Sequence, residues 1–285
     1  MSDINASQHA QKPSQDEARE QREEEEVSEK RAASAYIVYR AISDEADEEL
    51  ERPVAGLAWS GLAAGLSMGF SLVAEGLLRH YLPDTHWRPL VAKWGYTIGF
   101  LIVVLGRQQL FTENTLTPVL PLLRERDAKT FWKLVRLWVI VFITNMIGTA
   151  LFALVVAHTN IFDDSVKHQF VMMGREAIEP DFLTTILRGI FAGWLIALMV
   201  WLLPVAETGR IAVIMILTYL IGLGKMSHVV AGSIEVFYLA AADEASWFKA
   251  LELFILPSLI GNVIGGTALV AALNYAQAAA GKEEH

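Results

Sequence analysis

Two polar interruptions within long apolar stretches hold the residues best suited to handling a charged or acidic solute. Each gathers charged, amide and hydroxyl side chains: Arg107, Gln108, Gln109, Glu113 and Asn114 in the first, and Lys225, Ser227, His228 and Glu235 in the second. Histidine, with an unperturbed pKa of about 6.5, gains and loses a proton near neutral pH. A histidine placed there can donate a hydrogen bond or a proton to an anion.

Two interpretations of His228 are open. An isolated histidine in an apolar helix is usually a core residue whose hydrogen bonds are satisfied locally. His228, however, lies in an interruption that matches the polar interruption in the other half of the chain. This correspondence favours a functional role.

The composition excludes several other chemistries. The 285-residue chain has no cysteine, which excludes disulfides, a cysteine nucleophile, an iron–sulfur cluster and thiolate zinc. The sequence has no nucleotide-binding loop, no paired metal-ligating histidines and no nucleophile motif, and we expect Asp163, Asp164 and His168 to be solvated in a loop. We therefore predict that the chain is not an enzyme and has no catalytic residues, metal or cofactor.

The elements that must position these residues are six apolar stretches. About 20 helical residues cross the roughly 30 Å hydrocarbon core of a bilayer. Six stretches reach that length: approximately 54–78, 90–121, 134–157, 183–204, 211–241 and 251–279. A soluble helical protein is the alternative, but residues 137–157 contain no charge and no polar face. Irregular backbone at membrane depth must be buried or line a watery cavity, so we expect the second and fifth spans to be broken.

The two halves of this region resemble each other. Residues 145–151 match 262–269 at an offset of 117, and residues 61–65 match 189–193 at an offset of 128. Three spans followed by three related spans must be inverted in the membrane, because an odd number of crossings reverses direction. Broken helices at equivalent positions of inverted repeats indicate a central solute site.

The formal net charge of -9 belongs to the N-terminal segment. Residues 1–51 contain 15 acidic and 6 basic residues, and the rest of the chain contains 17 of each. The scattered basic residues offer no stripe that could neutralise successive phosphates. We therefore expect no nucleic-acid partner.

We predict three segments along the chain. They are a disordered acidic segment over 1–33, a short surface helix over 34–52 and a six-span domain over 53–281, with halves at about 53–157 and 183–279. Residues 1–33 are too polar to bury the apolar surface that would offset the entropy of ordering.

A basic loop between the second and third spans sets the expected orientation. It contains Arg124, Arg126, Lys129 and Lys133. The positive-inside rule places this loop, and with six spans both termini, in the cytoplasm. We expect a multi-pass protein of a bacterial-type inner (plasma) membrane, with the lipid bilayer as a partner.

Taken together, these features resemble the formate/nitrite transporter family over about residues 35–280. The resemblance rests on the six spans, the repeated Asn-x-Ile-Gly element, Leu110-Phe111-Thr112 in the second span, His228 in the fifth, and residues 189–201 of the fourth. It implies an aquaporin-like six-span protomer in a homopentamer, with one solute pore per protomer. Family members pass small monovalent anions of weak acids, often with a proton.

The resemblance also implies roles for individual residues. Leu110, Phe111 and Thr112 correspond to the family's Ω-shaped loop, and His228 to its central pore histidine. Leu110 and Phe111 would supply a dry collar, while Thr112 would orient the imidazole. A neutral acid escapes most of the cost of dehydrating an anion, so a proton supplied there would ease passage.

The charged residues near the pathway have alternative roles. Arg107 is either an anion-attracting charge or a structural partner of Glu113 or Glu235, and the cost of an unpaired guanidinium in a membrane favours the pair. Arg175 is the candidate for the family's electropositive entrance near the fourth span, and Lys225 is a further filter or entrance charge.

We therefore predict a channel or transporter for a small monovalent, formate- or nitrite-like anion of a weak acid, with proton coupling through His228 as one mechanism. A pore for a small neutral solute is one alternative. A non-transporting membrane scaffold or stress-linked protein, whose acidic N-terminal segment binds a partner, is another.

Overall fold

The computed structural model of the protein describes residues 35–280, except for the side chains at 269, 270, 272 and 278–280. The segment predicted to be disordered, 1–33, therefore lies outside the described residues, as does residue 281.

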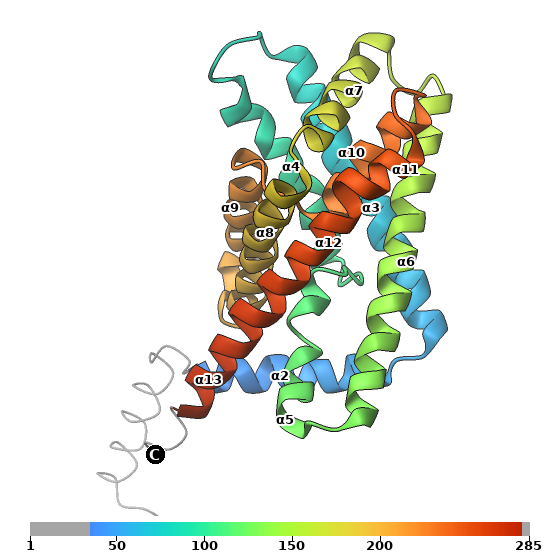
Figure 1. Ribbon diagram of the computed structural model, residues 1–285. Helices are drawn as coiled ribbons and strands as arrows, with labels where there is room; N and C mark the ends of the chain where they lie inside the picture. The colour runs from blue at the N-terminus through green and yellow to red at the C-terminus, as the bar shows by residue number, and fades with distance from the viewer. Residues whose placement is uncertain (1–34, 281–285) are drawn as a thin grey trace, which may run out of the picture. The chain divides into compact units, whose positions relative to one another are not determined.

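Long apolar helices make up most of the described region (Figure 1). Five described segments are long and apolar enough to cross a membrane: α3 (Val54–Tyr81), α4 (Arg88–Leu105), α6 (Ala128–His158), α8 (Phe182–Leu202) continued by η2 (Leu203–Val205), and the C-terminal run Trp247–Gln277. Many large apolar side chains on these helices are exposed, among them Trp132 and Leu183. Exposed apolar surface of this extent is typical of helices that face lipid.

The second and fifth spans are interrupted, as the polar residues within them predict. After α4, the chain passes through a loop, the 3-10 turn η1 (Glu113–Thr115) and the short α5 (Val119–Glu125). In the fifth span, η3 (Glu207–Gly209) precedes α9 (Arg210–Leu223) and α10 (Val229–Ala241), which have 14 and 13 residues and are each too short to cross a bilayer. Because α4 already has 18 residues, the first break lies nearer the end of its span than expected.

The C-terminal run contains two π-helical stretches. It consists of α11 (Trp247–Ala250), the π-helical η4 (Leu251–Ile255), α12 (Leu256–Val263), the π-helical η5 (Ile264–Ala271) and α13 (Ala272–Ala280). Such π-helical turns often occur at functional sites.

Small residues allow two pairs of helices to pack closely. A Cβ atom on Gly65 of α3 would lie 2.9 Å from the Cα of Gly148 on α6, and one on Gly189 of α8 would lie 3.1 Å from the Cα of Gly261 on α12. Close backbone approach at glycine is how membrane helices associate. The pairs α3–α6 and α8–α12 thus occupy equivalent places in the two halves.

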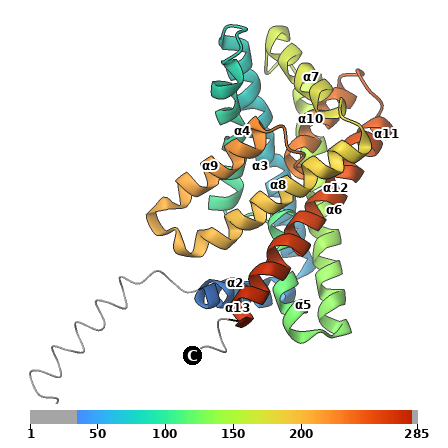
Figure 2. The same cartoon turned by 60° about the vertical axis from the view of Figure 1, so that its left-hand side comes forward.

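The ends of this bundle are occupied by amphipathic helices. Helix α2 (Ala35–Glu51) lies across one end, beside α5 and α13, and α7 (Asp164–Ile178) lies at the other end (Figures 1 and 2). One stripe of α2 is buried: Val38, Tyr39, Ile42, Ala46 and Leu50. Charges fasten its polar face, since Arg124 donates to Asp47 at 2.9 Å and Lys133 pairs with Glu51. The hydrogen bond and charge of Lys133 hold the pKa of Glu51 below its usual value.

Candidate functional site

The two breaks begin with the same backbone conformation. Gly106 and Gly224 end the preceding helices, and the next residues, Arg107 and Lys225, have left-handed φ angles of 50° and 51°. Arg107 N–H donates to the carbonyl of Val104 at 3.1 Å, and Lys225 N–H donates to that of Gly222 at 3.2 Å. A left-handed conformation is costly for residues with a Cβ, so its occurrence at both breaks marks a constrained turn.

Two asparagines hold the first break and the second break in the same way. Asn145 Nδ2 donates to the carbonyls of Gly61 and Gln109 at 2.8 and 2.9 Å, and its Oδ1 accepts from Phe111 N–H at 2.9 Å. The bonds to Gln109 and Phe111 satisfy backbone groups that the broken helix leaves without partners, and the bond to Gly61 ties the break to α3.

In the second half, Asn262 repeats this pattern. Its Nδ2 donates to the carbonyls of Gly189 and Ser227, both at 2.8 Å, and its Oδ1 accepts from Val229 N–H at 2.8 Å. The repeated Asn-x-Ile-Gly element of the sequence thus serves to clamp the two breaks.

The structure brings His228 and Thr112 together from opposite breaks. The Nε2 atom of His228 lies 2.7 Å from Thr112 Oγ1, and both residues are buried. His228 also caps α10, since its Nδ1 accepts from Ala231 N–H at 3.0 Å. The ring of Phe100 packs edge-on against the imidazole, with centroids 4.9 Å apart.

These bonds assign the proton of the neutral imidazole. A ring nitrogen that accepts a hydrogen bond carries no proton, so the Nδ1 atom of His228 is bare and Nε2 bears the hydrogen. Nε2–H then donates to Thr112 Oγ1, as the distance allows. A second proton on Nδ1 would break the cap of α10, so the geometry favours His228 as a neutral hydrogen-bond donor.

Leu110 and Phe111 occupy different surroundings. Leu110 is buried at 1% exposure, in the position that corresponds to His228 in the other break. The Phe111 ring packs against Phe142 of α6 at a centroid distance of 5.1 Å. Phe100, which the sequence did not single out, is the phenylalanine whose ring packs edge-on against His228.

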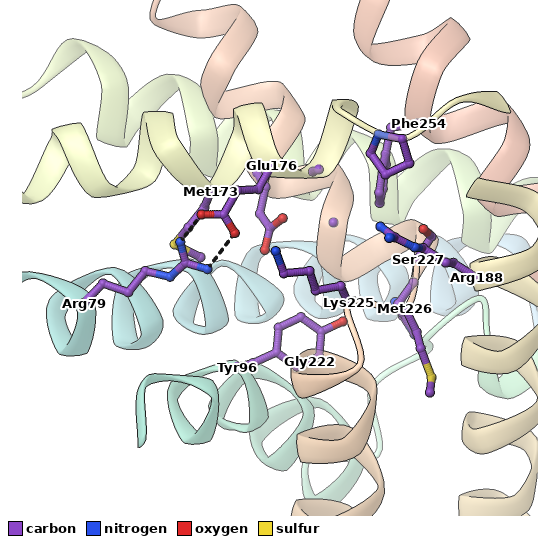
Figure 3. A pocket seen from close by; sticks show the side chains of 15 residues that line it. Arg79, Tyr96, Met173, Glu176, Arg188, Gly222, Lys225, Met226, Ser227 and Phe254 are labelled. Carbon is purple, nitrogen blue, oxygen red and sulfur yellow. Dashed lines mark hydrogen bonds and ion pairs between the residues drawn. The ribbon is translucent and has the colours of Figure 1, made fainter. Parts of the chain in front are cut away.

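A small cavity of about 60 Å³ lies on the α7 side of His228 (Figure 3). Its lining includes Ser227, His228 and Phe254, together with five charged residues: Arg79, Glu176, Arg188, Lys225 and Glu235. Figure 3 shows Arg79 paired with Glu176, whereas Lys225 and Arg188 approach from other elements. Within residues 35–280, no hydrogen bond or ion pair engages the side chains of Lys225 and Arg188.

Burial acts to raise the pKa of Glu176 on α7, but the hydrogen bond and charge of Arg79 outweigh it and lower that pKa below its usual value. The Arg79 Nη1 atom lies 2.7 Å from the carboxylate. Glu176 is therefore a charged, paired side chain at neutral pH.

A larger cavity of about 250 Å³ lies on the α2 side. Ile42, Glu45 and Glu49 of α2 contribute to its lining, as do Glu113 and Thr117 of the first break. The lining residues described for the two cavities are all different, and His228 belongs only to the α7-side cavity.

Arg107 is paired differently from the expectation. Its partner is Glu45 of α2, not Glu113 or Glu235, and its side chain is 73% exposed. The expectation was wrong because it treated Arg107 as membrane-buried, whereas α4 is long enough to bring the left-handed turn that follows it out to the α2-side cavity. Arg175 pairs with Glu244 at 2.5 Å and does not line the cavity beside His228. Arg188 lines that cavity instead.

Several charged residues of the α7 side were missed by sequence analysis. Glu75 is fully buried and accepts from Arg79 at 2.8 Å and from Lys93 at 2.6 Å. The spacing of four residues between Glu75 and Arg79 was an available signal, because residues at i and i+4 face the same side of a helix. Among the residues that the structure describes, none form a group arranged to hold a metal ion.

The described chain forms apolar helices long enough to cross a membrane, and two of its spans are broken. The two breaks are held by asparagines and meet at a buried imidazole beside a charged cavity. These features define an integral membrane channel or transporter. The chain belongs to the formate/nitrite transporter family, since that family's sequence pattern matches residues 36–276. The resemblance predicted from the sequence is thereby confirmed.

Individual relatives agree with this assignment. The chain is 39% identical over 253 residues to the inner membrane protein YfdC of Escherichia coli strain K12, covering 88% of this chain and 82% of that protein. It is 22% identical over 223 residues to the uncharacterized transporter YwcJ of Bacillus subtilis strain 168, covering 75% of this chain and 86% of that protein.

Solved structures share the fold. A pentameric formate channel with formate bound superposes with a TM-score of 0.67 at 18% identity, covering 82% of this chain and 98% of that chain. An ion channel of the same family gives a TM-score of 0.72 at 17% identity, covering 84% and 98%. The predicted all-α membrane fold is confirmed by these matches.

Proposed function

We propose that the chain conducts a small monovalent anion of a weak acid, such as formate or nitrite, through a passage that runs past His228. The observation that carries the proposal is the hydrogen bond between His228 Nε2 and Thr112 Oγ1 at the meeting point of the two breaks. In the passage, a dehydrated anion can replace Thr112 Oγ1 as the acceptor of the hydrogen bond from His228 Nε2–H. The formate bound in the superposed channel supports the same solute class.

Electrostatics on the α7 side support an anionic solute. Arg188 and Lys225 line the cavity beside His228 and have no ion-pair partner among the described residues. Cations in a narrow cleft raise the local concentration of anions. Their positive potential draws the anion to the imidazole, while Leu110 and the ring of Phe100 keep the passage dry.

The roles of the other predicted residues follow from their positions. Phe111 acts mainly through packing against α6, and Arg107 fastens α2 through Glu45. Arg175 acts at the surface through Glu244, outside the cavity lining.

We further propose that the protein is a homopentamer of a bacterial inner membrane, with a pathway in each protomer and both termini in the cytoplasm. The E. coli relative is named as an inner membrane protein, and the superposed formate channel is pentameric. The basic residues around the connection between α5 and α6, Arg124, Arg126, Lys129 and Lys133, support the cytoplasmic location of the termini.

Flux of labelled acids into proteoliposomes tests the proposal. We expect formate or nitrite uptake above that of protein-free vesicles from about pH 5 to about pH 8, and its loss in His228→Ala. Glu179→Gln is a matched control, because Glu179 is exposed on the loop after α7 and does not line the cavity. Uptake unchanged in His228→Ala would remove the histidine from the mechanism, and no uptake of any acid would refute the channel.

A pore for a neutral solute is the second candidate. The α2-side cavity is lined by three carboxyl groups, of Glu45, Glu49 and Glu113, and by two guanidinium groups, of Arg107 and Arg210, so it lacks the excess of positive charge that would favour an anion. Stopped-flow light scattering with a small polyol separates the candidates, since neutral-solute permeation is insensitive to membrane potential.

A further inference from the structure

Glu235 is a carboxylate of the α7-side cavity that the mechanism above leaves unused. It follows His228 by seven residues, two helical turns, and therefore lies on the same side of α10. Both residues line the cavity. Within the described part of the chain, no hydrogen bond or ion pair engages its side chain.

The elements packed around Glu235 carry charges of both signs. They are Glu75 and Arg79 on α3, Lys93 on α4, Glu176 on α7, Arg188 on α8 and Lys225 after α9. Three of these are already committed to one another, since Arg79 bridges Glu75 and Glu176. Lys93 is likewise 2.6 Å from Glu75. Glu235 is thus the lining carboxylate that remains available to a solute.

Glu113 is a carboxyl group that lines the α2-side cavity. It directly follows Thr112, the partner of His228. Its Oε1 atom is buried without a hydrogen-bond partner. The charged groups around this cavity are Glu45 and Glu49 on α2, Arg107 after α4 and Arg210 on α9.

His228 itself is poorly placed to supply a proton. Nδ1 accepts the capping bond from Ala231 N–H, and Nε2 engages Thr112. Releasing the Nε2 proton would leave an imidazolate, and adding a proton at Nδ1 would break the cap. The available proton carriers near the imidazole are therefore carboxyl groups.

A protein carboxyl group and an incoming carboxylate anion can share one proton. Two carboxylates brought into one site share a single proton, because like charges at contact distance cannot both stay ionised. The arrival of a formate-like anion beside Glu235 would therefore itself promote proton sharing, with Arg188 and Lys225 drawing the anion in.

We propose that Glu235 and Glu113 are proton-transferring carboxyl groups, one in each cavity, that convert the permeating anion to its neutral acid and back. This inference rests on the proposed function. Protonated Glu235 gives its proton to a carboxylate oxygen of the anion, which leaves a Glu235 carboxylate and a neutral acid. The acid passes His228 and gives that proton to the Glu113 carboxylate, which regenerates the anion. Glu235 regains a proton from water on its own side, and Glu113 releases one on the other.

Proteoliposomes that report labelled formate and internal pH together test the inference. The wild-type protein should carry about one proton with each formate, in keeping with the balanced step. In Glu235→Gln and Glu113→Gln, uptake near neutral pH should fall on the order of tenfold or more, because the positioned acid is gone. Uptake should recover toward about pH 5, where bulk acid supplies protons.

Two further variants separate proton transfer from folding. Glu235→Asp keeps a carboxyl group and should retain most of the wild-type pH profile, and Glu179→Gln should leave it unchanged. Uptake reduced by the same factor at every pH in Glu235→Gln, or a wild-type profile in both glutamine variants, would overturn the inference while leaving the channel intact. No formate uptake by the wild-type protein would overturn the proposed function and this inference with it.

Discussion

The break after α4 and the break after α9 share a backbone and differ in what that backbone presents. Each begins with a left-handed turn and is held by two hydrogen bonds to an asparagine, whose third bond goes to a neighbouring helix. At corresponding positions, however, one break presents Leu110 and the other presents His228. The backbone of the break is therefore duplicated, whereas the imidazole is present in only one of the two breaks.

The residues at the two left-handed turns, Arg107 and Lys225, also differ in their surroundings. Arg107 is drawn away by Glu45 of α2, whereas Lys225 stays in the α7-side cavity without an ion-pair partner in the described structure. The charge at the start of the first break is thus paired within the protein, whereas the charge at the start of the second break stays in the cavity, where the proposed passage would use it.

Exchanging the two central residues tests this asymmetry with the largest expected effect. We expect His228→Leu to lower weak-acid flux on the order of 100-fold, because the hydrogen-bond donor of the passage is lost. The double variant Leu110→His/His228→Leu should remain inactive, since Val230 occupies the place that Thr112 holds in the other break. Recovery of proteoliposome flux in the double variant would show that the two breaks are interchangeable.

Removing either asparagine clamp tests the symmetry of the scaffold. Asn145→Ala and Asn262→Ala each delete three buried hydrogen bonds, and we expect each to lower the free energy of unfolding by about 3 kcal/mol. Asn274→Ala is the matched control, because the Nδ2 atom of Asn274 has no partner in the described structure. Denaturation in detergent measures all three, and a large loss in only one clamp variant would contradict the duplicated scaffold.

Adding a methyl group to the close helix contacts should cost somewhat less. A Cβ on Gly65 would meet Gly148 at 2.9 Å, and a Cβ on Gly193 would meet the Cα of Asn262 at 2.7 Å. We expect Gly65→Ala and Gly193→Ala each to destabilise the protein by about 1–3 kcal/mol through overpacking. Gly56→Ala, in open space on α3, should be neutral or stabilising. Equal melting temperatures for all three variants would exclude tight packing at these glycines.

The smallest expected effect concerns helix caps. Asp127 caps α6, and Ser246 caps α11 at the start of the equivalent C-terminal run. The backbone and side-chain hydrogen bonds from Thr130 lower the pKa of Asp127, so its charged form is favoured in the folded state. Its contribution to stability is present above the unfolded pKa of about 3.9 and is lost as the pH falls through the lower folded value.

Thermal melts from about pH 6 to about pH 3 check this prediction. Asp127→Asn keeps a capping oxygen and should show a smaller loss of melting temperature on acidification than the wild-type protein, whereas Ser246→Asp should show a larger one. Identical pH profiles for the three proteins would rule out a contribution from the Asp127 cap.

Periodicity and polarity were sufficient to predict the helical membrane fold, the two breaks and the internal similarity. Asn145 and Asn262 stand out in sequence because a buried amide needs partners in an apolar helix. The proximity of Thr112 and His228 followed from the family resemblance, since residues 116 positions apart give no local signal.

Charge partners across the fold could not be predicted. Arg107 meets Glu45 only because α2 crosses the bundle end, and Arg79 of α3 meets Glu176 of α7. Hydropathy gives the depth of a residue along its own span, but it carries no information about which neighbouring element supplies a counter-charge. The participation of Arg188 in the cavity was missed for the same reason.

The cysteine-free chain permits a direct test of whether the two cavities are the mouths of one passage. Ser227→Cys places a thiol in the α7-side cavity and Thr117→Cys places one in the α2-side cavity. A membrane-impermeant thiol reagent should label each variant from opposite faces of the proteoliposome and block formate flux in both. Labelling of both positions from one face, or full labelling without loss of flux, would contradict a solute route past His228.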